Sequence, residues 1–134
     1  MNSATNFNVM VMRAVTELFR NYPKPITIDN DVILSPPLKV NDPDYRERQE
    51  ASSTTCRWLI DNRIALGTPL DSVPLNEPQV FAIWGAQLSQ SAWKILSKAE
   101  GKNDLSLGQI ALASLSGQSE ASTAALVMKR LTGD

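Results

Sequence analysis

The stretch of sequence that decides the fold runs from residue 44 to residue 99 and contains four segments of contrasting pattern. Residues 51–60 read ASSTTCRWLI, residues 64–67 IALG, residues 80–84 VFAIW and residues 88–96 LSQSAWKIL. The first and last of these suit helices, whereas the middle two are short apolar runs next to Gly or Pro, which favours strands. The sequence therefore predicts a helix over residues 44–62, a two-stranded turn, and a second helix that Ser89 or Gln90 caps and Gly101 ends.

The predicted 44–62 helix has two faces. A helical wheel places one arc toward the core, formed by Tyr45, Ser52, Cys56 and Leu59. The opposite arc is polar and consists of Arg46, Glu50, Ser53, Thr54, Arg57 and Asp61. Serine, threonine and arginine suit contacts to phosphates and base edges, but the acidic side chains would repel phosphates. The polar arc is therefore either a binding face or a merely solvated one.

The two strand candidates are Ile64–Leu66 and residues 79–84, and we expect them to pair. The connection from Gly67 to Pro78 contains three prolines, which predicts a loop with Thr68 near its start. Large aromatic side chains bury much apolar area, so we expect Trp58, Trp84 and Trp93 to meet around this hairpin. At least one tryptophan serving a binding surface is the alternative.

The N-terminal third predicts a helix that Thr5 or Asn6 caps and that ends near Asn21, before Tyr22-Pro23. Its apolar surface is wider than one stripe, which fits a central core helix or one shared with a second subunit. Residues 25–28 suggest a short strand, followed by a brief helical turn capped by Asp29. A single longer strand through Val32 is the alternative.

Residues 102–134 predict two short helices, one beginning at Asp104 and one capped by Gln118 or Ser119. We expect a domain over residues 1–101 and an Ala-rich helical segment over residues 102–134. That segment could pack on the domain, associate with another copy, or stay mobile until a partner arrives.

Composition restricts the function more than it defines it. The 13 basic and 14 acidic residues give a net charge of −1, without the basic excess that phosphate-driven nucleic-acid binding usually requires. The chain has no histidine and one cysteine, Cys56. We expect the Cys56 side chain to be buried and to pack as a small apolar group. Neither a signal peptide nor a membrane-length apolar run is visible, so a cytoplasmic location is expected.

Chemical motifs are weak. Ser91 and Lys94 match a Ser-x-x-Lys pattern, but the other elements of such enzymes are missing and the pattern is common by chance. The acidic pairs at residues 29 and 31 and at residues 42 and 44 are better explained by turns and helix caps than by a cation site. We expect no enzyme, no metal and no cofactor.

Residues 55–64, followed by residues 88–96, resemble the closing half of small bacterial winged helix-turn-helix proteins. In those proteins a Thr-x-x-Trp-Leu segment ends the third helix, and a Leu-Thr-x-x-Gly phrase opens the next; here Ser89 replaces the threonine and Ala92 the glycine. The resemblance implies a mainly α fold with a small β-hairpin. It also implies a DNA-associated regulator, expected to be homodimeric. In such a regulator Arg46, Ser53, Thr54 and Arg57 would contact DNA, and wing residues near Thr68 would touch the DNA backbone.

Winged helices also serve protein assembly. The alternative is a protein-binding adaptor or inhibitor, such as an accessory factor of a phage or mobile element, that uses the scaffold without DNA.

Overall fold

The computed structural model describes residues 3–72, 79–100, 104–115 and 120–133, and it is mainly helical with a small antiparallel sheet. This confirms the expected mixture of helices with a β-hairpin. In those ranges the helices are α1 (Ser3–Asn21), α2 (Asn30–Ile33), α3 (Tyr45–Asp61), α4 (Gln90–Ser97), α5 (Leu107–Ser114) and α6 (Glu120–Leu131). The strands are β1 (Ile26–Asp29), β2 (Ala65–Ser72) and β3 (Gln79–Leu88).

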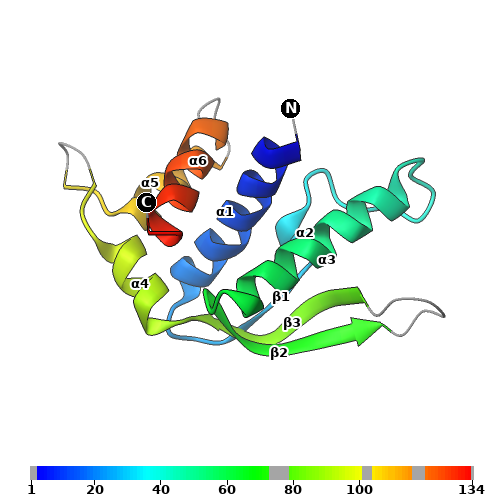
Figure 1. Cartoon of the computed structure of the whole chain (residues 1–134), viewed down its shortest axis with the longest axis horizontal. Coiled ribbons are helices and arrows are strands. Elements are labelled where there is room, and N and C mark those ends of the chain that lie inside the picture. Colours follow the sequence, from blue (N-terminus) through cyan, green and yellow to red (C-terminus); the bar gives the residue numbers. More distant parts are fainter. Residues whose placement is uncertain (1–2, 73–78, 101–103, 116–119, 134) are drawn as a thin grey trace.

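Helix α1 is the centre of the molecule. It passes between α6 on one side and α3 on the other, with the sheet across its C-terminal end (Figure 1). Its buried side chains cover more than half of the circumference of the helix: Val9, Val11, Met12, Ala14, Val15, Thr16 and Leu18. The buried Thr16 hydroxyl donates to the Met12 carbonyl, so it is satisfied within the helix. Of the two roles predicted for this helix, the structure shows the central core helix, whereas a cap at Thr5 or Asn6 is wrong because α1 already includes Ser3.

The sheet has the order β1-β3-β2, and both pairings are antiparallel. The predicted hairpin is present, since β2 pairs with β3, but the predicted register is wrong. Ala65 and Leu66 lie opposite Leu88 and Gln87, Ile64 precedes β2, and residues 79–84 pair with the later part of β2. The predicted loop from Gly67 is wrong: β2 continues to Ser72, and Thr68 pairs with Trp84. Pro69 is compatible with this strand because β2 is at an edge of the sheet, where a missing N–H need not break a ladder. Residues 73–78 of the predicted loop lie outside the described ranges.

Asp29 ends β1 and starts α2. Its carboxylate accepts the backbone N–H groups of Asp31 and Val32 at 3.0 and 3.3 Å, as an N-cap does. The predicted strand followed by a helical turn is confirmed, and the alternative of one longer strand is wrong. A side-chain network then joins α2 to α3: Asn30 donates to Gln49 at 2.6 Å and accepts from Ser52 at 2.7 Å.

The predicted 44–62 helix is confirmed as α3, with Cys56 and Leu59 in the core. Tyr45 was expected to point inward, but it is 37% exposed. It is the first residue of α3, and the core beneath the helix does not extend that far.

The three tryptophans do not meet, so their expected cluster is wrong. Trp93 of α4 stacks on Tyr22 and Phe19 at the end of α1, with ring centroids 4.2 and 5.2 Å away. Trp58 of α3 packs edge-to-face on Phe7, and Trp84 of β3 is 63% exposed.

Helix α4 begins after Ser89, whose hydroxyl caps it as predicted, but it ends at Ser97 and not at Gly101. Helix α5 begins at Leu107 and not at Asp104, because Ser106 and Gln109 form a capping box that defines the start. The predicted caps of α6 at residues 118 and 119 lie outside the described ranges.

Both C-terminal helices contribute to the core, and α6 packs along α1. Of the three predicted roles of this segment, the structure therefore shows packing on the domain. Arg13 of α1 binds both carboxylate oxygens of Glu120 at 3.2 and 2.9 Å. Arg130 of α6 binds Glu100, and this hydrogen bond lowers the pKa of that carboxyl. The division at residue 101 stays a prediction.

Candidate binding surfaces

The polar arc of α3, which the sequence predicts as a possible binding face, is narrower in the structure than expected. Arg46, Thr54 and Arg57 are exposed, but Ser53 is only 3% exposed and cannot contact a partner in this structure. The physical reason is that α3 packs against β2 and β3 on one side and against α1 and α2 on another, so only a thin outer strip remains in solvent. The Ser53 hydroxyl is buried without a hydrogen-bond partner among the described residues.

The charges on this strip are mixed. Besides Arg46 and Arg57, α3 exposes three acids, Glu47, Glu50 and Asp61. Thr68, the fifth predicted contact, is exposed on β2 opposite Trp84. A DNA-reading helix gains affinity from phosphate contacts with Lys and Arg, and acids on the same strip oppose those contacts.

Helix α2, the segment that links it to α3 and the first turns of α3 form a more distinctive surface, which we call the acidic end and define as residues 29–50. It contains six acidic and three basic residues, an excess of three negative charges. One of its arginines, Arg48, is already occupied, since it donates to Asp42 at 3.2 Å and to the Pro36 carbonyl. Asp31 is exposed and makes no ion pair within the described part of the chain.

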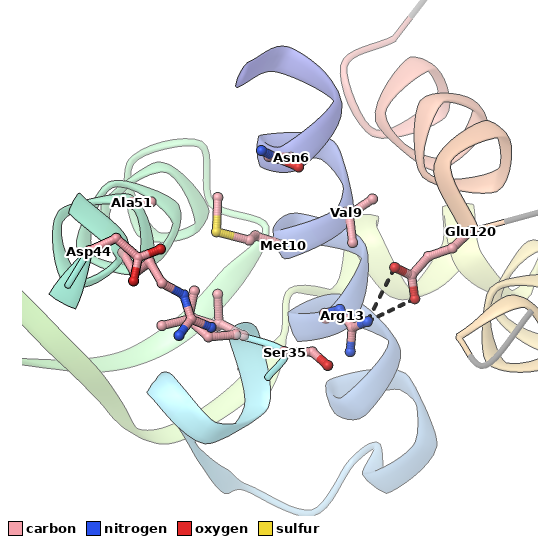
Figure 2. Close-up of a pocket in the computed structure, with 11 residues that line it drawn as sticks. Asn6, Val9, Met10, Arg13, Ser35, Asp44, Ala51 and Glu120 are labelled. Carbon is pink, nitrogen blue, oxygen red and sulfur yellow. Dashed lines mark hydrogen bonds and ion pairs between the residues drawn. The ribbon is translucent and has the colours of Figure 1, made fainter. Parts of the chain in front are cut away.

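Two hollows open at the acidic end, and each is lined in part by the Pro-rich segment that links α2 to α3. The first has a volume of about 310 Å³ and lies between α1, α3 and the start of α6. Figure 2 shows its Met10 and Val9 wall on α1, Ala51 on α3 with Asp44 just before that helix, and the Arg13–Glu120 pair. Both arginines that line it, Arg13 and Arg48, are paired with carboxylates, so it offers no free positive group to an anion.

The second hollow, which we call the apolar hollow, has a volume of about 280 Å³. Its residues come from β1, α2, α3, β3 and the linking segment, and they are Asp29, Asn30, Asp31, Leu38, Val40, Tyr45 and Phe81. Three of them are large apolar side chains left in solvent: Val40 is 89% exposed, Phe81 40% and Tyr45 37%. Exposed apolar side chains that converge on one hollow, next to acids, are typical of an interaction site.

Sequence reasoning missed this hollow for a specific reason. Phe81 is predicted as part of a strand and Tyr45 as a core residue, whereas Val40 falls in none of the predicted elements. The available signal was the position of Val40 between a diproline and an Asn-Asp-Pro turn, where an apolar residue has no core to enter.

The structure shows little sign of catalytic or metal chemistry in the residues it describes. Burial, and secondarily the charge of Asp29, raises the pKa of the Cys56 thiol to about 12, so the thiol stays protonated and unreactive. No group of three or more potential metal ligands converges in residues 3–72, 79–100, 104–115 and 120–133. Among the helices in the same ranges, none has both the length and the apolar character needed to cross a bilayer.

Comparison of the chain with protein-family models, with curated proteins and with solved structures found no match.

Proposed function

We propose that this chain is a protein-binding adaptor or inhibitor built on a winged-helix-like scaffold, and that it acts without reading DNA. The observation that carries the proposal is the chemistry of the acidic end. In winged helix-turn-helix regulators, the N-terminal part of the recognition helix enters the major groove close to phosphates. Here the acidic end has an excess of three negative charges and two exposed large apolar side chains, Val40 and Tyr45, which lie beside Phe81 of β3.

The scaffold part of the proposal is supported by topology. The elements follow one another as α1, β1, α2, α3, β2 and β3, and the sheet order is β1-β3-β2. This is the arrangement expected of a winged helix, with β2 and β3 as the wing strands. The resemblance of residues 55–64 and 88–96 points the same way.

A DNA-associated regulator is the second candidate, because the same topology and the exposed Arg46, Thr54 and Arg57 favour it. Fluorescence anisotropy with a random duplex at low salt separates the two candidates. We expect no saturable binding at a salt concentration of about 20 mM, where phosphate contacts are strongest. Binding that weakens steeply with salt and disappears in the Arg46→Ala/Arg57→Ala double variant would refute the proposal and favour the regulator.

The positive test is reconstitution with a purified partner. A protein captured from the native host by the immobilised chain is identified by mass spectrometry, expressed separately and mixed with the chain. We expect light scattering to show one defined stoichiometric complex that persists after nuclease treatment. A complex that forms only when nucleic acid is present would contradict the proposal.

A further inference from the structure

We infer that the apolar hollow receives one apolar side chain of the partner protein, flanked in the partner's sequence by Lys or Arg. This inference rests on the proposed function, and it names the part of the surface that recognises the partner. The size of the hollow is the first reason. At about 280 Å³ it is just below the range of about 300–1,000 Å³ usual for pockets that hold cofactors or drug-sized ligands. The space is sufficient for one large side chain of a partner.

The wall is the second reason. Val40, Tyr45 and Phe81 come from three separate parts of the chain, yet they line one hollow with Leu38. Each loses solvent contact if a partner side chain enters, and such buried anchors provide most of the affinity of protein interfaces. Phe81 and Tyr45 belong to β3 and α3, so part of the wall is held by the folded scaffold before the partner arrives.

The charge around the hollow is the third reason, and it selects the occupant. Asp29 and Asp31 both line the hollow. The Asp29 carboxylate caps α2, but that of Asp31 is exposed and makes no ion pair in the described ranges. Lys39 is the only basic residue between Asp29 and Asp44, and it is not among the lining residues. A partner segment with basic residues beside the apolar anchor therefore gains charge complementarity, whereas an acidic segment is repelled.

The experiment uses three blocked tripeptides as probes against the isotope-labelled full chain in an NMR titration. The peptides are Arg-Leu-Arg, the same sequence with Ser in place of Leu, and Glu-Leu-Glu. We expect Arg-Leu-Arg to produce saturable shifts at the amides of Asp31, Val40, Tyr45 and Phe81. We expect each of the other two to bind at least about fivefold more weakly, because each lacks either the buried anchor or the charge complementarity.

Matched variants locate the site. Phe81→Ser should weaken Arg-Leu-Arg binding about tenfold, whereas Leu105→Ser, which alters an apolar residue of similar exposure (43% against 40%), should leave it unchanged. Val40→Ser keeps the test valid if Phe81→Ser unfolds, since an 89% exposed side chain contributes little to the fold. Asp31→Asn should weaken binding about threefold, the size expected for a solvent-screened charge pair, and Asp61→Asn should not.

Several results would overturn the inference. These are no saturable shift at about 5 mM Arg-Leu-Arg, equal binding of all three peptides, or shifts centred on another surface. A homodimer in light scattering that Phe81→Ser dissociates would assign the hollow to a second copy of the chain. A reconstituted partner complex that is insensitive to Phe81→Ser and Val40→Ser would also overturn the inference while leaving the proposed function standing. Duplex binding, by contrast, would refute the proposed function itself.

Discussion

Two glycines of the hairpin, Gly67 and Gly85, provide a direct test of how β2 and β3 approach each other. Both have positive φ angles, +152° at Gly67 and +63° at Gly85. They differ in what a side chain would meet. A Cβ at Gly67 would lie 2.8 Å from Ile83 Cγ2 and 2.9 Å from the Trp84 carbonyl oxygen, whereas a Cβ at Gly85 would meet nothing within 4 Å.

The two alanine substitutions should therefore have different costs. Each places an L-residue in a left-handed backbone conformation, which costs roughly 1–2 kcal/mol. Gly67→Ala adds overpacking against backbone that cannot rotate away, which costs roughly a further 1–3 kcal/mol. Part of both costs is offset because alanine has less conformational freedom than glycine in the unfolded chain. We expect Gly67→Ala to destabilise the fold by about 2–4 kcal/mol and Gly85→Ala by about 1 kcal/mol.

Equilibrium urea denaturation followed by far-UV circular dichroism measures both free energies of unfolding without relying on Trp84, which is adjacent to Gly85. Val40→Ser is a suitable reference variant, because its position is exposed and should change stability little. If the two alanine variants agree to within about 0.5 kcal/mol, the close approach at Gly67 does not restrict the residue there, and the reasoning is refuted.

Three further outcomes are expected. The Cys56 thiol should resist a disulfide reagent at pH 8 until the chain unfolds, and rapid labelling of the folded chain would contradict this expectation. Because the pKa of the thiol is raised from about 9 to about 12, its contribution to stability is full below pH 9 and is lost as the pH rises toward 12. Glu120→Gln should lower the free energy of unfolding by about 1 kcal/mol, measured by thermal or urea denaturation, because it weakens the partly buried pair with Arg13. Glu17→Gln, in the exposed pair within α1, should lower it less, and equal losses would argue against a link between α1 and α6. Ser106→Ala should lower stability by about 1 kcal/mol by removing the cap of α5, and an unchanged midpoint would show that the capping box contributes little.

These predictions bear on the proposed function because the binding surface depends on the scaffold. Phe81 of the apolar hollow lies on β3, and the pairing of β3 with β2 requires the close approach at Gly67. A change that loosens the hairpin should therefore also disturb the hollow.

Local pattern in the sequence determined much of the secondary structure. The helical spacing around Cys56 and Leu59 predicted α3, Asp29 predicted the cap of α2, and Ser89 predicted the cap of α4. Capping and periodicity depend on residues within one or two turns of each other, so the chain itself carries this information. One mistake fell where a glycine and a proline suggested a loop, between Gly67 and Ser72, although an edge strand tolerates such residues. Others concerned the first residue of a helix, as at α1 and α5.

The tertiary structure decided which faces are buried. Ser53 and Tyr45 exchanged their expected roles, because the exposure of a side chain on α3 depends on how many neighbours that helix meets, which no single segment encodes. The same holds for the candidate site. Val40, Tyr45 and Phe81 are separated in sequence by up to 41 positions and become one surface only when the linking segment, α3 and β3 fold together. Sequence determined the elements and their charge, whereas packing determined which of those charges and apolar side chains are available to a partner.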